Sequence, residues 1–168
     1  MHRIRNYDIK RSSALPRSFS MRYVFVLLFM FFGTLHANEY KAIFDCSSGD
    51  ANYIKTRMWL IGKTMSMVEE SGDKANFVIT LHGSCVPMIS KNYDFIVKEK
   101  DVANTKQAQE HLRELAQKRG VKVIACAMSL ASNAIDKEDV LEFVHITPNS
   151  FIDTIAYQNS GYAIMTFK

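Results

Sequence analysis

The stretch from Gln107 to Ala127, QAQEHLRELAQKRGVKVIACA, decides the fold class of this chain. Its first part, up to Arg119, repeats apolar side chains at the spacing of a helix with one buried face, at Leu112, Leu115 and Ala116. Gly120 then stands where a helix commonly ends in a left-handed residue. The β-branched run that follows is typical of a strand covered on both faces of a parallel sheet.

The same alternation of strand and helix extends over the rest of the chain after a leader. The patterns predict strands at Tyr40–Asp45, Asn76–Leu81, Val121–Ala127, Glu142–Thr147 and Tyr162–Phe167. They predict helices at Ala51–Glu70, Gln107–Arg119, Asp136–Leu141 and Ser150–Asn159, with Asp50 and Asn149 as N-caps. The polar stretch from Ser90 to Thr105 is expected to be a loop with an extra strand turn at Tyr93–Val97. Five strands alternating with helices predict a three-layer α/β sandwich with a mainly parallel sheet.

The length, 168 residues, fits a single domain, and the net charge of +4 raises the question of an anionic partner. The positive charge is concentrated at the front, because residues 1–37 contain six basic residues and one acidic residue. The remaining chain has 15 basic and 16 acidic residues, which gives a net charge of −1. We therefore expect no nucleic-acid partner.

Residues 1–37 have the pattern of a signal peptide. Val24–Phe32, VFVLLFMFF, is an apolar run of nine residues that follows a basic region, and Leu35-His36-Ala37 is a candidate cleavage site. A helix that spans a bilayer needs about 20 residues, so the run is short for an anchor. We expect residues 1–37 to be removed, from a start at Met1 or Met21, and residues 38–168 to form the domain. The mature protein is expected to be periplasmic or otherwise exported, without stable membrane insertion.

All three cysteines lie at or just beyond predicted strand ends. Cys46 follows the first strand, Cys85 follows the second and Cys126 is near the end of the third. Ligands of parallel α/β sheets bind beyond the carboxyl ends of the strands, so this edge is the expected site. Three interpretations remain open at this point. Cys126 is a buried packing residue or a reactive thiol, Cys46 and Cys85 form a disulfide, or all three join His82 in a zinc or copper site.

Several motifs resemble the DsrE/DsrF-like (DsrEFH-like) family. The resemblance rests on the order of five short segments: Phe44-Asp45 with Ser48-Gly49-Asp50, His82-Gly83, Arg119–Leu130 around Cys126, His145–Pro148, and Gly161–Ala163. It covers nearly the whole chain after the leader. It implies a three-layer α/β/α fold with a five-stranded parallel sheet, assembled as a homotrimer or homohexamer. In characterised members, a cysteine at the position of Cys126 carries a persulfide in a sulfur relay.

The resemblance leads to a specific functional hypothesis, in which Cys126 binds or transfers sulfane sulfur. Cys46 or Cys85 would be a resolving thiol or part of a disulfide. The pocket is expected to contain Asp45, Ser48, Gly49, His82, Gly83 and Met128. We expect no cofactor and no metal in this reaction, and the expected partner is a sulfur-donor or sulfur-acceptor protein. The alternative hypothesis is a non-catalytic oligomer that binds a small ligand or a metal at the same edge.

Overall fold

The computed structural model describes residues 37–167, so the predicted signal peptide, apart from Ala37, lies outside the described residues. The strands are β1 (Glu39–Cys46), β2 (Lys74–Leu81), β3 (Lys122–Cys126), β4 (Val144–Thr147) and β5 (Ala163–Phe167). The α-helices are α2 (Ala51–Glu70), α3 (Tyr93–Ile96), α4 (Glu99–Arg119), α5 (Ala127–Ser132) and α6 (Ser150–Asn159). Two 3₁₀ helices, η1 (Gly83–Ile89) and η2 (Lys137–Asp139), complete the elements.

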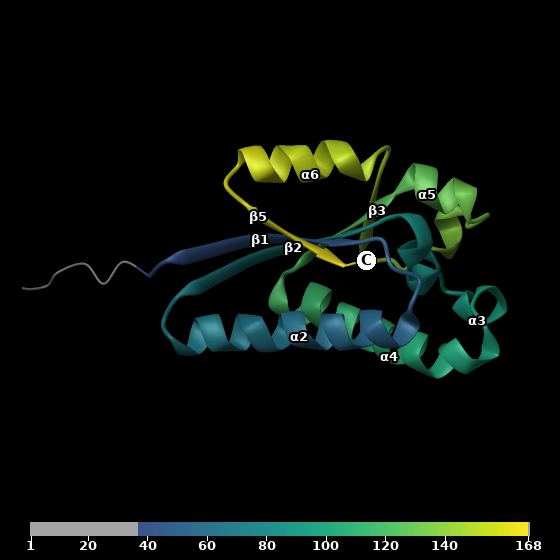
Figure 1. The fold of residues 1–168 in the computed structure, drawn as a ribbon, viewed down its shortest axis with the longest axis horizontal. Coiled ribbons are helices and arrows are strands. Elements are labelled where there is room, and N and C mark those ends of the chain that lie inside the picture. The colour runs from purple at the N-terminus through teal and green to yellow at the C-terminus, as the bar shows by residue number, and fades with distance from the viewer. Residues whose placement is uncertain (1–36, 168) are drawn as a thin grey trace, which may run out of the picture. The chain divides into compact units, whose positions relative to one another are not determined.

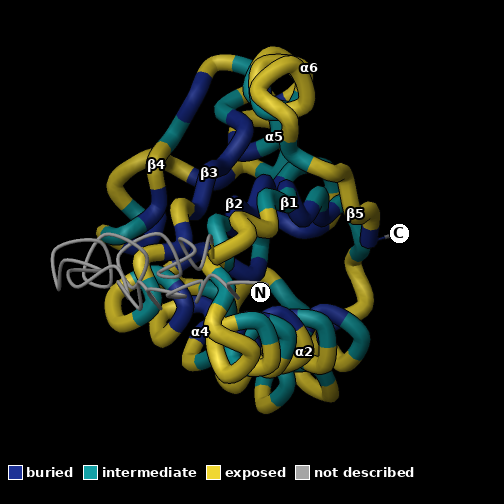
Figure 2. Tube along the Cα trace, turned by 90° about the vertical axis from the view of Figure 1, so that its left-hand side faces the viewer, coloured by how far each residue is buried: buried dark blue, intermediate teal, exposed yellow. Residues whose placement is uncertain are grey.

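The five strands form one sheet in the order β4-β3-β2-β1-β5, and every neighbouring pair is parallel. Helices α2 and α4 cover one face of the sheet, and α6 covers the other, with α5 at the carboxyl ends of the strands (Figure 1). The predicted three-layer α/β/α sandwich with a five-stranded parallel sheet is therefore confirmed. The central strands β1 to β3 are largely buried, whereas the outward faces of the helices are exposed (Figure 2).

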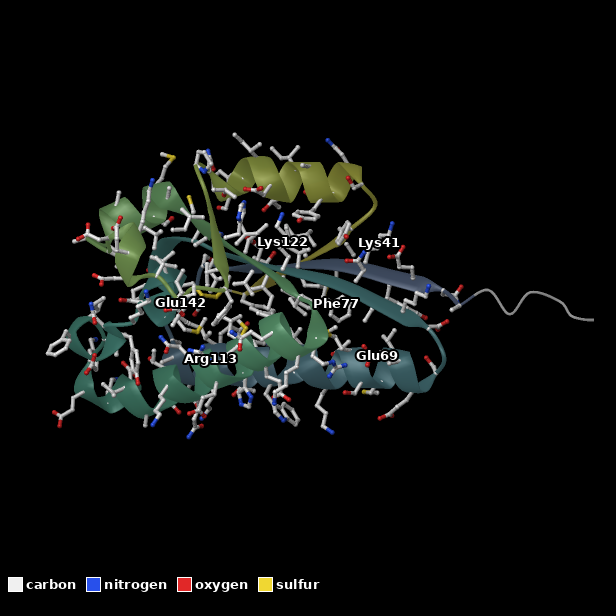
Figure 3. The ribbon with its side chains drawn as sticks, turned by 180° about the vertical axis from the view of Figure 1, so that it is seen from behind. Lys41, Glu69, Phe77, Arg113, Lys122 and Glu142 are labelled. Carbon is white, nitrogen blue, oxygen red and sulfur yellow. A yellow bond between two sulfur atoms is a disulfide. The ribbon has the colours of Figure 1, made fainter. Side chains whose placement is uncertain are left out.

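Side chains along each strand alternate between the two helical layers, and this alternation decides where the functional residues point. Phe77 of β2 lies in the layer that faces α2 and α4, with Phe44 of β1 in edge contact at 5.1 Å between ring centroids (Figure 3). Lys41 and Lys122 point to the opposite side, where their ammonium groups lie 5.9 Å from the Tyr162 and Tyr157 rings (Figure 3). On each strand, residues two and four positions after Lys41, Phe77 or Lys122 face the same layer as that residue.

Three helix boundaries follow the residues expected from the sequence. The Asp50 carboxylate accepts a hydrogen bond from the Tyr53 amide at 2.9 Å and begins α2, and the Asn149 side chain accepts one from the Phe151 amide at 3.0 Å and begins α6. Gly120 ends α4 with a φ of 70°, a left-handed conformation that costs glycine little. These caps position α2 and α6 against opposite faces of the sheet.

Other local predictions were wrong. Helix α4 begins at Glu99, eight residues before the predicted Gln107, because the buried residue of this first part is the polar Thr105, which gives no apolar periodicity. The extra strand turn predicted at Tyr93–Val97 is instead the helical turn α3. The helix predicted at Asp136–Leu141 is limited to the 3₁₀ turn η2. Helix α5 was not given bounds in the prediction, because six residues are too few to show a helical period.

Candidate functional site

The three cysteines separate into a disulfide and one free thiol. Cys46 and Cys85 are bonded to each other, with their Cα atoms 5.9 Å apart, and both are completely buried in the core that faces α2 and α4. Cys126 is the free cysteine of the described residues. It stands two positions after Ile124, which packs beneath α6, so the alternation of β3 turns its thiol toward the α6 layer. The disulfide and the free thiol therefore belong to opposite faces of the sheet.

Cys126 is the last residue of β3 and the N-cap of α5. Its side chain is 5% exposed. Burial raises the pKa of the thiol, but the amides of Ser150 and Ser129 and the hydroxyls of the same two serines lower it by more, to about 7. The neutral thiol makes no capping hydrogen bond, so the lowered pKa reflects bonds that the thiolate accepts. A substantial fraction of this cysteine is therefore in the nucleophilic form near neutral pH.

Two buried hydroxyl groups lie beside Cys126 without hydrogen-bond partners. Thr147 of β4 is the register partner of Cys126, so its side chain stands next to the thiol on the same face of the sheet. Ser150 begins α6 and is within reach of the thiolate. The Oγ1 of Thr147 and the Oγ of Ser150 make no hydrogen bond in the structure of residues 37–167. Buried polar atoms are usually paired, so these two hydroxyls are hydrogen-bond donors available to a charged sulfur at Cys126.

An acid–base pair lies at the ends of the neighbouring strands β1 and β2. The Nε2 atom of His82 is 3.2 Å from both carboxylate oxygens of Asp45, and the Thr80 hydroxyl donates to Asp45 at 2.7 Å. Burial raises the pKa of Asp45, but the hydrogen bonds from His82 and Thr80 lower it below its ordinary value. The hydrogen bond with Asp45 raises the pKa of His82 against the opposing effect of burial, with further contributions from the charges of Asp45 and Cys126.

A small hydrogen-bond network joins the segment after β2 to α5. The Gly83 amide donates to the Ser129 hydroxyl at 2.9 Å. The Asn133 side chain donates to the Ser129 carbonyl at 2.8 Å and to the Gly83 carbonyl at 3.3 Å. Gly83 adopts a φ of 53°, which a side chain at this position would strain. The network therefore fixes His82, the residue just before Gly83, next to α5, the helix whose N-cap is Cys126.

The structure brings some of the residues predicted for the pocket together and separates others. Asp45, His82 and Gly83 lie at the strand ends around Cys126. Ser48 instead accepts a hydrogen bond from the Asp50 amide at 3.3 Å in the turn after β1. Gly49 lines a separate cavity of about 260 Å³ with Ser84 and Asn133, which does not include Cys126.

Met128 is 65% exposed at the start of α5 and points to solvent near Cys126. Four further residues at the site were not predicted from the sequence: Thr80, Ser129, Thr147 and Ser150. The available signal was their position, because each lies on or just beyond a strand end and has a short hydroxyl side chain.

The metal interpretation is unsupported by the geometry. Within residues 37–167, no three His, Cys, Asp or Glu side chains lie close enough to hold a metal ion.

In the same part of the chain, no helix has the length and apolar character needed to cross a membrane.

Comparisons with known proteins give a family match, a sequence relative and a structure of the same fold. The model of the DsrE/DsrF-like family matches residues 41–167. An uncharacterized protein of Aquifex aeolicus (strain VF5) is 34% identical over 160 residues, which cover 94% of this chain and 69% of the relative. The solved structure of MTH1491, a protein of unknown function from Methanobacterium thermoautotrophicum, superposes with a TM-score of 0.57 at 16% identity. That superposition covers 76% of this chain and 99% of MTH1491, and it shows a shared fold.

Proposed function

Because this chain belongs to the DsrE/DsrF-like family, we propose that it is an exported sulfur carrier whose Cys126 takes up sulfane sulfur as a persulfide and passes it on. The observation that carries this proposal is the environment of Cys126. It is the free thiol of the described residues, its pKa is about 7, and two buried hydroxyls beside it have no partner. These features favour a thiolate that attacks sulfur and that has hydrogen-bond donors beside it.

The proposed uptake step is a nucleophilic displacement. The Cys126 thiolate attacks the outer sulfur of a donor persulfide or polysulfide, the donor's sulfur–sulfur bond breaks, and the donor leaves as a thiolate. The new bond joins Cys126 Sγ to the transferred sulfur, and no external oxidant is needed. The hydroxyl of Thr147 is suited to donate a hydrogen bond to the added sulfur, because it lies beside the thiol and lacks another partner, while the Ser150 hydroxyl faces Cys126 Sγ itself.

Export is supported by the leader pattern and by the disulfide. Disulfides persist in oxidising compartments and are rare in the cytosol. The Cys46–Cys85 bond is buried at both ends and connects β1 to η1, so it suits a protein that folds outside the cytoplasm. In this account Cys46 and Cys85 stabilise the fold, and Cys126 alone reacts with sulfur.

We also propose that the protein forms a homotrimer or homohexamer and meets a sulfur-donor or sulfur-acceptor protein. Exposed apolar side chains on α6 support an interaction surface, because Phe151, Ile152 and Ile155 are each more than half exposed. The near-neutral charge after position 37 argues against a nucleic-acid partner. Light scattering of the purified protein would test the assembly, and a monomer at all concentrations would contradict it.

The proposed function is tested by loading the purified mature protein with polysulfide and measuring its mass under non-reducing conditions. We expect an added mass of about 32 Da, one sulfur atom, that dithiothreitol removes. The matched control is Cys126→Ala, which retains the disulfide and should gain no sulfur. A wild-type protein that stays unmodified while folded, or a Cys126→Ala variant that loads equally well, would overturn the proposal.

A further inference from the structure

Asp45, His82 and Cys126 come from the ends of three consecutive strands in the sheet, β1, β2 and β3. The β2–β3 register pairs Leu81 with Ala125, so His82 follows on β2 at the level of Cys126 on β3. Neighbouring strands are about 4.8 Å apart, which places the two residues side by side. Within the described residues no hydrogen bond joins the imidazole to the thiol, and the charge of Cys126 raises the pKa of His82, so the two side chains interact through charge.

The imidazole of His82 is held from two sides. Asp45 contacts its Nε2 atom at 3.2 Å, and the Phe151 ring of α6 meets the imidazole edge-on at 5.6 Å between centroids. The Thr80 hydroxyl donates to Asp45 at 2.7 Å and leaves the carboxylate oriented toward the histidine. The side chains of His82 and Asp45 are 17% and 14% exposed, so solvent screens their interaction only partly.

From this arrangement we infer that Asp45 and His82 are positioning residues that keep a positive charge beside Cys126 and thereby make it a better leaving group during sulfur transfer. This inference rests on the proposed function. In the transfer step an acceptor thiolate attacks the outer sulfur of the Cys126 persulfide, the bond between the two sulfurs breaks, and Cys126 leaves as a thiolate. The acceptor becomes the persulfide, and no proton moves to or from His82 in this step.

The charges around His82 make its effect on Cys126 depend on pH. Among the described residues, Asp45 from β1 and Cys126 from β3 are the ionisable groups that act on His82. Helix α6 contributes the uncharged Phe151 ring, and α5 contributes Ser129, which is also uncharged. Coupling between two ionising groups is reciprocal, so a Cys126 thiolate that favours the imidazolium is itself favoured by it. Neutral His82 would withdraw this stabilisation.

The first test measures the rate at which iodoacetamide alkylates Cys126 as a function of pH, in protein whose disulfide is intact. His82→Gln removes the charge and retains an amide hydrogen-bond donor. We expect the inflection to move to higher pH and the rate at pH 6.5 to fall about fivefold, as expected for loss of a unit charge in a partly solvated site. The control is His145→Gln, which removes an exposed histidine of β4 and should leave the profile unchanged.

Asp45→Asn separates a charge effect from a structural one. Without the carboxylate, His82 should lose its proton at a lower pH. The variant should therefore alkylate more slowly than wild type at pH 7 and approach the wild-type rate as the pH falls and His82 regains its proton. His82→Gln should stay slower than wild type at low and neutral pH and reach the wild-type rate only at high pH, where Cys126 is a thiolate in both. A purely structural role would lower the stability of both variants without this pH-dependent difference.

The second test follows the transfer step with protein already loaded with sulfur. Cyanide removes the outer sulfur as thiocyanate and leaves Cys126 as a thiol. We expect His82→Gln to load the same amount of sulfur and to release thiocyanate about fivefold more slowly at pH 7. Identical alkylation profiles for wild type, His82→Gln and His145→Gln would overturn the inference. Failure of the wild type to load sulfur would instead contradict the proposed function, because the alkylation profile does not depend on sulfur.

Discussion

Loss of the Cys46–Cys85 disulfide should lower the free energy of unfolding by about 4 kcal/mol. The bond closes a loop with a sequence separation of 39 residues. The loop-closure relation gives roughly 13 cal/mol/K of lost entropy in the unfolded chain, which is about 4 kcal/mol at 25 °C. Both half-cystines are buried, so reduction in the folded state should be slow, and the difference should appear when the protein unfolds.

The assay is a urea titration of the Cys126→Ala variant with and without a phosphine reductant. This background prevents exchange between Cys126 and the disulfide, and its remaining cysteines are the bonded pair. With a urea m value of about 2 kcal/mol/M, reduction should move the midpoint down by about 2 M. The same reductant should not shift the midpoint of a variant that also carries Cys46→Ala and Cys85→Ala.

Two results would refute this reasoning. A thiol count of three in the purified, unfolded wild-type protein would mean that the disulfide does not form. A reduced protein whose unfolding free energy stays within about 1 kcal/mol of the oxidised form would mean that the bond does not restrict the unfolded chain as the loop length predicts.

Three other substitutions separate stability from chemistry. Gln109→Leu removes hydrogen bonds of 2.7 Å and 2.8 Å from the buried Gln109 amide to the carbonyls of Met88 and Ser90. It should cost roughly 2–4 kcal/mol in urea unfolding, and a loss under about 0.5 kcal/mol would contradict the burial of these carbonyls. Asp45→Asn should cost most near pH 5, because folding lowers the pKa of Asp45 and raises that of His82. Stabilisation from the pair is therefore lost as pH falls below about 4 or rises above about 6.5, so a cost that does not vary with pH in thermal unfolding would argue against the pair. Thr147→Val replaces an unpaired buried hydroxyl and should raise stability by roughly 1 kcal/mol while lowering the persulfide yield; a less stable variant with unchanged yield would contradict this role.

The sheet and most of its helices could be predicted because more than one sequence feature indicates each of these elements. The strand around Ile124 is continuously apolar, as burial on both faces requires, and α2 repeats its apolar positions at helical spacing between a capping aspartate and a glycine turn. The early turns of α4 could not be predicted in this way. They bury Thr105, and a polar residue leaves no periodic apolar signal.

The site could be predicted only in part. The strand-end rule assigned Cys46, Cys85 and Cys126 to one edge of the sheet, because parallel strands end together, and Asp45 and His82 lie at the same strand ends. The rule does not say which face of the sheet each side chain takes. In the register of the sheet, Cys126 lies one position further along than Cys46. Cys46 therefore faces the α2 and α4 layer and Cys126 faces α6, which separates the disulfide from the free thiol.

The central claim is that Cys126 carries sulfur in the working protein. The most direct measurement is the mass of the tryptic peptide from Val123 to Lys137, which contains Cys126 as its single cysteine. The protein should be isolated without reductant from the cells that make it and blocked with an alkylating agent before digestion. We predict a population of this peptide that is heavier by one sulfur, about 32 Da, than the alkylated thiol. A peptide found only as the alkylated thiol, with extra sulfur on the peptides of Cys46 or Cys85 instead, would contradict the account.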